Sequence, residues 1–238
     1  MDSTWYKDIN DFAVHTAWLH GFMKVYAVYG VGIFAVLVLA AWWYARSQPD
    51  PARAVAASIW TAAGTVLAVG VNQIIVHEVA RPRPYITLRG VEVLVARSTD
   101  YSFPSDHAIT AGAATAGLWI IARYSGRAVR ALAAVGTVLA LLLAFARVYV
   151  GAHYPGDVAA GLLIGAAIAV IGWFAVRTVL TSLVARIAGY RPFRPFVVAT
   201  AGARLPARPV GPSRNGAGPR ADTSPATVPG SAGRRHQP

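Results

Sequence analysis

Five long runs without a charged residue dominate the pattern of this 238-residue chain. They are Val25–Ala45, Ala54–Val76, His107–Ala122, Ala131–Ala146 and Val158–Val176. About 20 apolar residues cross a bilayer as a helix, and charged residues that flank a shorter run can reach the interface by snorkelling. The pattern therefore predicts an all-α fold, a polytopic membrane bundle of about five transmembrane helices within residues 25–190.

Small residues are concentrated in two of these runs, at Thr110–Gly117 and at Gly161–Ala167. In lipid, small side chains let helix backbones approach closely, and van der Waals packing then drives association. We expect close helix–helix contacts at both segments.

The composition agrees with a membrane protein and excludes several other classes. Charged residues make up 13% of the chain, roughly half of the 25% that is usual in soluble domains. The chain has no cysteine, which excludes a disulfide framework, a thiolate nucleophile and a cysteine-ligated metal site.

The two ends of the chain differ from the apolar middle. Residues 1–24 have no basic leader region, which argues against a signal peptide. Within Ile9–Phe22, helical spacing relates Phe12, His15, Trp18, Leu19 and Phe22, which predicts an amphipathic helix lying on the membrane surface. Residues 199–238 are rich in Pro, Gly, Ala and Arg without apolar periodicity, so we expect a disordered tail. For this basic tail, contact with anionic membrane lipid is favoured over binding to nucleic acid.

Basic residues are distributed unevenly between the two predicted sides of the membrane. The loops at 46–53 and 123–130, together with the segment from Arg177 onward, hold 15 of the 22 Lys and Arg residues. Basic loops near spans are retained in the cytoplasm. We therefore expect an integral protein of the plasma membrane whose C-terminal tail is cytoplasmic, with the loops at 77–106 and 147–157 facing outward.

Three segments of unusual chemistry fall on the predicted outer side, namely Asn72–Tyr85, Ser102–His107 and Ala146–Asp157. They contain three of the six histidines and the arginines Arg81, Arg83 and Arg147. Charged groups at a membrane boundary are costly, and guanidinium groups suit phosphate oxygens. One boundary His or Arg alone is more typical of an interfacial anchor. Their joint occurrence on one side predicts a site for an oxyanion.

The spacing of His153 and Asp157 predicts a nucleophile with its orienting partner. The two residues are four apart, and Pro155 between them suits the first turn of a helix. Asp157 can hold one imidazole nitrogen, which leaves the other nitrogen unprotonated and aimed.

Ser105 and His107 supply the complementary chemistry in the second segment. Ser105 stands at a predicted helix N-cap, so free N–H groups of the following turn would face an anion. His107 could donate a proton to a leaving group. In the first segment, we expect Asn72 and Gln73 to form hydrogen bonds between helices rather than to bind a ligand.

At these residues the chain resembles the type 2 phosphatidic acid phosphatase and vanadium haloperoxidase superfamily, whose signatures are K-x6-R-P, P-S-G-H and S-R-x5-H-x3-D. The third signature appears as Arg147, His153 and Asp157, with Ala146 in place of its Ser. The second appears as Pro104–His107, with Asp in place of Gly.

The first signature is incomplete. The pair Arg83-Pro84 is present, but Val76 occupies the Lys position. Arg81 or His77 is the candidate replacement for that cation. Asp106 within the second signature resembles the bacterial undecaprenyl pyrophosphate phosphatases linked to bacitracin resistance.

The resemblance implies an all-helical bundle and a metal-independent, cofactor-free phosphatase acting on a lipid phosphate. It implies that His153 attacks phosphorus, that Asp157 orients it and that His107 protonates the leaving oxygen. The phosphoryl oxygens would be bound by Arg83, Arg147, Ser105, Arg81 and backbone N–H groups near Asp106.

Three functions remain open from the sequence. The first is a phosphatase for undecaprenyl pyrophosphate, the spent form of a lipid carrier that appears on the outer leaflet during cell-wall synthesis. The second is a phosphatase for another lipid, such as phosphatidate or phosphatidylglycerol phosphate. The third is a non-enzymatic, anion-binding membrane protein such as a small permease, against which the lack of a repeat and of ionisable residues at mid-membrane argues.

Overall fold

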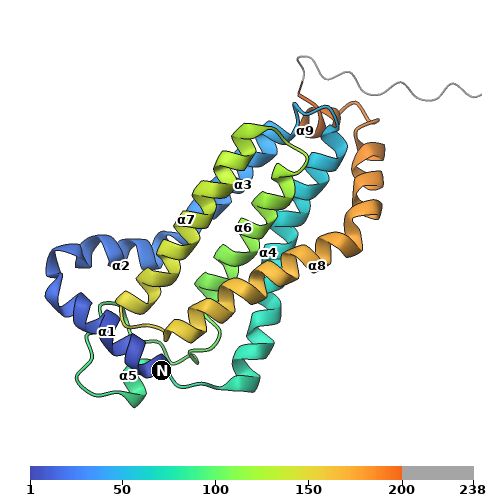
Figure 1. The fold of residues 1–238 in the computed structure, drawn as a ribbon. Coiled ribbons are helices and arrows are strands. Elements are labelled where there is room, and N and C mark those ends of the chain that lie inside the picture. Colours follow the sequence, from blue (N-terminus) through green and yellow to red (C-terminus); the bar gives the residue numbers. More distant parts are fainter. Residues whose placement is uncertain (200–238) are drawn as a thin grey trace, which may run out of the picture. The chain divides into compact units, whose positions relative to one another are not determined.

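The computed structural model of this protein describes residues 1–199, and all the regular structure in that range is helical (Figure 1). The predicted tail lies, from residue 200 onward, outside the described residues. The helices are α1 Asp2–His15, the 3-10 helix η1 Ala17–Leu19, α2 His20–Tyr29, α3 Val31–Ala45, α4 Pro51–Val79, α5 Pro84–Thr87, α6 Asp106–Ala122, α7 Arg127–Tyr149, α8 Pro155–Ile187 and α9 Arg194–Val197. The predicted all-α fold is confirmed.

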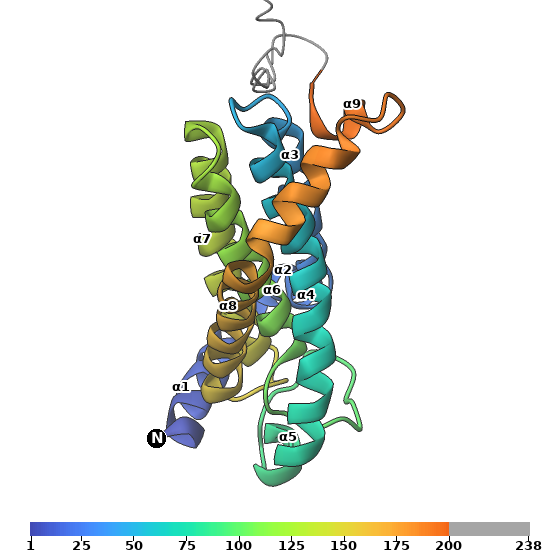
Figure 2. The ribbon, with the colours of Figure 1, turned by 90° about the vertical axis from the view of Figure 1, so that its right-hand side faces the viewer.

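The central helix of the bundle is α6, which contacts α3, α4, α7 and α8. These helices run side by side in both ribbon views (Figures 1 and 2). Most residues of α6 are buried. A Cβ added at Gly112 would lie 2.2 Å from the carbonyl oxygen of Leu162, and one at Gly165 would lie 2.2 Å from that of Ile109. The close contacts predicted from the small residues are therefore confirmed, and they join α6 to α8.

Within residues 1–199, three to four helices can span a membrane by length and composition. Pro51–Thr87, Arg127–Tyr149 and Pro155–Ile187 qualify alone, and the bent pair Ala17–Tyr29 and Val31–Ala45 is a fourth if it counts as one span. With 17 residues, α6 is shorter than the three helices that qualify alone. Helices occupy the positions of all five predicted runs, with α2 and α3 sharing the first run, but five spans remain a prediction.

The first predicted span is not one straight helix. Instead of continuing over Val25–Ala45, the chain bends by 57° between α2 and α3, at Gly30. Contacts to α7 hold α2 in this direction, because the Tyr26 hydroxyl donates to the Leu139 carbonyl oxygen at 2.7 Å. Hydropathy gives no sign of the bend, since both sides of Gly30 are apolar.

The N-terminal segment contains two helices and a 3-10 turn rather than one amphipathic helix. Helix α1 buries Tyr6 and Asn10 and contacts α7 and α8, while Trp5, Phe12 and Trp18 are exposed. Its place on a membrane surface remains a prediction. We call the end of the bundle that carries α1 and the start of α8 the α1 end, and the opposite end, which carries α9, the α9 end (Figure 1).

The α9 end is closed by the last described residues. The Arg46 guanidinium donates from Nη1 to the Pro195 carbonyl oxygen at 2.9 Å, and Trp42 Nε1 donates to that of Phe196 at 3.2 Å. Val197 is buried in the hydrophobic cluster against which Trp42 also packs. Helix α9 is thereby held against the α3–α4 connection.

Candidate active site

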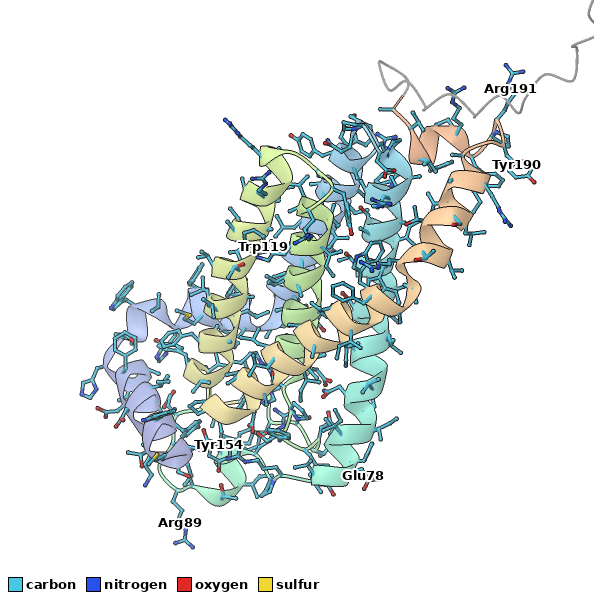
Figure 3. The ribbon with its side chains drawn as sticks, turned by 45° about the vertical axis from the view of Figure 1, so that its right-hand side comes forward. Glu78, Arg89, Trp119, Tyr154, Tyr190 and Arg191 are labelled. Atoms are coloured by element: carbon cyan, nitrogen blue, oxygen red, sulfur yellow. The ribbon has the colours of Figure 1, made fainter. Side chains whose placement is uncertain are left out.

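The three polar segments predicted to face one side meet at the α1 end of the bundle. They contact one another through hydrogen bonds between Asn72–Tyr85, Ser102–His107 and Ala146–Asp157. Figure 3 shows Tyr154 and Arg89 at this end and Tyr190 at the other. The site thus lies where α4 ends and where α6 and α8 begin.

His153 is buried in this cluster, with 3% of its surface exposed. Its Nδ1 lies 2.8 Å from the carbonyl oxygen of Ser102. A carbonyl oxygen can only accept a hydrogen bond, so Nδ1 carries the proton of the neutral ring. The lone pair is consequently on Nε2.

Two guanidinium groups flank that lone pair. Arg83 Nη1 and Arg147 Nη2 each lie 3.3 Å from His153 Nε2. Backbone carbonyl oxygens hold both side chains, that of Asp100 at 2.9 Å from Arg83 Nε and that of Ala27 at 3.1 Å from Arg147 Nη1.

Both arginines are buried, with at most 9% exposure, and neither forms an ion pair with a carboxylate within residues 1–199. The Nε atom of Arg147 is also buried without a hydrogen-bond partner in that range. Buried charges are stable only when compensated. Two adjacent, uncompensated cations therefore form a receptor for an anion, placed directly at His153 Nε2.

The same surroundings favour the neutral form of His153. Burial, reinforced by the charges of Arg147 and Arg83 and opposed by the nearby carboxylate of Asp157, lowers the pKa of His153 to about 4. Its Nε2 is then unprotonated at neutral pH, as a nucleophile requires.

Asp157 is fully buried, and its two oxygens have different partners. Oδ1 lies 2.7 Å from Arg81 Nη1, while Oδ2 accepts from the Ser102 hydroxyl and from the Tyr154 backbone N–H at 2.8 Å. His153 Nδ1 is 3.7 Å from Oδ2. The expected direct hold on the imidazole is thus replaced by Ser102, which contacts both residues.

Ser105 is the N-cap of α6, as expected, and its backbone N–H donates to the Asp157 carbonyl oxygen at 3.2 Å. Its hydroxyl is buried and has no partner within the described residues. Asp106 Oδ1 accepts from Asn72 Nδ2 at 2.6 Å and from Gln73 Nε2 at 3.1 Å. This confirms the prediction that the two amides form hydrogen bonds between helices.

His107 occupies the first turn of α6 and is half-buried. It lies near enough to Arg147 and His153 to interact with both electrostatically. His107, at the start of α6, and His153, in the connection between α7 and α8, therefore lie at the same end of the bundle as the two arginines.

The candidates for the missing cation of the first signature lie elsewhere. Val76 is buried, and His77 is exposed with its ring edge-on to Tyr101. The guanidinium of Arg81 contacts two carboxylates, those of Asp157 and Asp2. Within residues 1–199, Arg81 and Arg83 do not share a hydrogen-bond partner.

Two residues that touch this machinery gave no signal in the sequence. Ser102 begins the second polar segment, but nothing in its local sequence marks it as the partner of His153 and Asp157. Asp2 is 79 residues from Arg81, and nothing in its local sequence marks it. Only the folded chain brings these groups together.

The chain is similar to known proteins over most of the described residues. The family model described as "PAP2 superfamily" matches residues 57–182, a range that includes every site residue above except Asp2.

Two curated relatives match most of the chain. "Undecaprenyl-diphosphatase BcrC" of Bacillus subtilis (strain 168) is 30% identical over 159 residues, which cover 67% of this chain and 76% of the relative. "Bacitracin transport permease protein BcrC" of Bacillus licheniformis is 28% identical over 163 residues, covering 67% and 73%.

A membrane phosphatase of known structure shares the fold. The crystal structure of a transmembrane PAP2 type phosphatidylglycerolphosphate phosphatase from Bacillus subtilis superposes with a TM-score of 0.54 at 17% sequence identity, covering 79% of this chain and 88% of that one. At this identity the likeness concerns the fold alone.

Proposed function

Since this chain belongs to the PAP2 superfamily and is an integral membrane phosphatase, we propose that it hydrolyses undecaprenyl pyrophosphate to undecaprenyl phosphate and phosphate. The observation that carries the proposal is the lone pair of His153 Nε2, which lies between two buried, uncompensated guanidinium groups. That arrangement suits a phosphoryl group under attack by nitrogen.

In the first step, Nε2 of His153 attacks the terminal phosphorus and the bond to the bridging oxygen breaks. Arg83, Arg147 and the free hydroxyl of Ser105 bind the equatorial oxygens, where negative charge spreads in the transition state. His107 protonates the leaving oxygen of the lipid monophosphate. The products are the lipid monophosphate and a phosphohistidine.

In the second step, water attacks the phosphohistidine and His107, now neutral, accepts the proton of that water. The nitrogen–phosphorus bond breaks, and phosphate and free His153 result. Throughout both steps the Ser102 carbonyl oxygen accepts from Nδ1–H and stabilises the positive charge on the ring, while Asp157 holds Ser102.

The choice of substrate rests on the relatives. The Bacillus subtilis protein is named for undecaprenyl diphosphate, and this chain carries Asp106 in the second signature, as in the bacterial undecaprenyl pyrophosphate phosphatases. The name of the solved structure, a phosphatidylglycerolphosphate phosphatase, supports a second candidate substrate. The name of the other relative suggests transport, but a permease has no need of a nucleophilic lone pair at its anion site.

Phosphate release by the purified protein in detergent tests the proposal. We expect the highest kcat/KM for undecaprenyl pyrophosphate, compared with undecaprenyl monophosphate, phosphatidate and phosphatidylglycerol phosphate. A higher kcat/KM for one of the phosphoglycerides would transfer the assignment to the second candidate. If no phosphate were released from any of the four lipids, the proposal that this protein is a lipid phosphatase would be contradicted.

Chelation of divalent metals should leave the activity unchanged. Arg83 and Arg147 already provide the positive charge that a metal ion would supply at the phosphoryl oxygens. We expect EDTA, added at about 5 to 10 mM, to leave the rate of phosphate release within about twofold of the rate without it. Vanadate, which can adopt the five-coordinate geometry of the transferring phosphoryl group, should inhibit. A strict requirement for added divalent ion would contradict the two-histidine mechanism.

We further propose that the site faces outward and the α9 end faces the cytoplasm, as the distribution of basic residues indicates. Because the chain has no cysteine, single substitutions can report each side. In intact cells, Arg89→Cys at the exposed α1 end should react with an impermeant thiol reagent. The matched variant Arg127→Cys, at the exposed start of α7, should react only after permeabilisation. The opposite pattern would place the site in the cytoplasm.

A further inference from the structure

The guanidinium of Arg81 lies between two carboxylates from distant parts of the chain. Its Nη1 is 2.7 Å from Oδ1 of Asp157, and its Nη2 is 2.7 Å from Oδ2 of Asp2. The group also stacks 4.0 Å from the ring centroid of Tyr154, which follows His153 in the chain. The position of the Arg81 guanidinium is therefore fixed by the two carboxylates and by the face of the Tyr154 ring.

Asp2 makes a second contact beside the same site. Its Oδ1 accepts from the backbone N–H of Gly156 at 2.8 Å, in the residue directly before Asp157. A Cβ at position 156 would lie 2.9 Å from Asp2 Oδ2, so a glycine allows this approach. One carboxylate of α1 thus binds both the cation that holds Asp157 and the backbone beside Asp157.

We infer that Asp2 is a positioning residue for phosphoryl transfer, acting through Arg81 on Asp157. The proposal rests on the proposed function. Asp2 holds Arg81 in the orientation that binds Asp157 Oδ1, which leaves Oδ2 directed at Ser102, and Ser102 directs His153. Asp2 itself touches none of the reacting atoms.

This inference differs from the prediction that Arg81 binds a phosphate of the substrate. If Arg81 were a substrate ligand, Asp2 would compete with the phosphate for the guanidinium, and neutralising Asp2 would lower KM. If Asp2 positions Arg81, neutralising it leaves Arg81 with one ionic partner and misaligns Asp157. In that case kcat falls and KM changes little.

The test is Asp2→Asn, measured as kcat and KM for undecaprenyl pyrophosphate beside Asp8→Asn. The control removes an equal charge from an exposed position of the same helix. We expect Asp2→Asn to lower kcat by about 10- to 100-fold, the loss of one hydrogen bond between charged groups, with KM within about twofold. Asp8→Asn should match the wild type. Asp2→Glu, which keeps the carboxylate, should recover part of the loss.

The double variant Asp2→Asn/Arg81→Gln shows whether the effect passes through Arg81. Its kcat should equal that of Arg81→Gln alone, because residues that act through one contact are not additive. A lower KM with unchanged kcat, or an effect of Asp2→Asn equal to that of Asp8→Asn, would overturn the inference.

A readout without catalysis separates this inference from the proposed function. Thermal unfolding of the same variants in detergent should show coupling between positions 2 and 81 whether or not the wild type releases phosphate. An inactive wild type with that coupling would contradict the proposed function and leave the bridge between Asp2 and Arg81 standing. Additive shifts in the unfolding temperature would contradict the bridge itself.

Discussion

Replacing His153 with alanine is expected to lower phosphate release by at least about 10³-fold, because the substitution removes the atom that forms the bond to phosphorus. The groups hydrogen-bonded to Nε2, the guanidiniums of Arg83 and Arg147, carry no lone pair that could attack phosphorus in its place. Rapid quench with radiolabelled substrate should trap a phosphoenzyme in the wild type and none in the variant.

The variant should keep its fold and its anion receptor. His153 lies in the connection between α7 and α8, outside both helices, and the carbonyl oxygens that hold the two arginines remain. Vanadate binding by His153→Ala should therefore persist, although weakened. The matched control is His15→Ala, an exposed histidine at the same end of the bundle, which should retain wild-type turnover. A phosphoenzyme in His153→Ala, or turnover above a small fraction of the wild-type rate, would show that another residue is the nucleophile.

The parts of this site that the sequence predicts are those fixed by local spacing. Pro155 begins α8, and Asp157 follows within the first turn of that helix. Ser105 is the N-cap of α6. In each case the residues that set the backbone are adjacent in sequence to the residues that carry the chemistry, so periodicity and capping preferences are enough.

The parts that sequence analysis misses are set by tertiary contacts. The chain has many carbonyl oxygens and hydroxyl groups, and nothing local identifies those of Ser102 as the partners of His153 and Asp157. The pairing of Arg81 with Asp2 depends on how α1 packs against α8. The bend at Gly30 is invisible for another reason, because an unbroken apolar run reads as one span whether or not its helix turns.

Fold and site also depend on each other through the contact between α6 and α8, where the largest effect on stability is expected. Adding one methyl group in Gly165→Ala would place a Cβ 2.2 Å from the carbonyl oxygen of Ile109 and 2.9 Å from the Ala113 backbone nitrogen. Backbone atoms of a buried helix cannot move aside as a flexible side chain can. The two helices must separate, and overpacking of this kind costs about 1–3 kcal/mol or more in the free energy of unfolding.

A glycine-to-alanine substitution at an open position should instead leave the free energy of unfolding unchanged or increase it. A Cβ at Gly70, on an exposed face of α4, meets nothing within 4 Å. In a helix interior, alanine is more favourable than glycine by about 1 kcal/mol. In thermal unfolding followed in detergent, Gly70→Ala should melt at or above the wild-type temperature and Gly165→Ala well below it. Equal melting temperatures would show that α6 and α8 are not in backbone contact.

Gly165→Ala should also be less active than Gly70→Ala, because the two helices that it separates carry site residues. Helix α6 brings Ser105 and His107, and helix α8 brings Asp157, with the Ser105 N–H and the Asp157 carbonyl oxygen 3.2 Å apart at their common end. The methyl group added at position 165 separates the two helices, and these groups then move apart even in molecules that remain folded. We therefore expect Gly165→Ala to lower kcat at a temperature where the variant is still fully folded, whereas Gly70→Ala keeps the wild-type value. A destabilised Gly165→Ala enzyme with unchanged kcat would show that the site keeps its geometry independently of the helix contact.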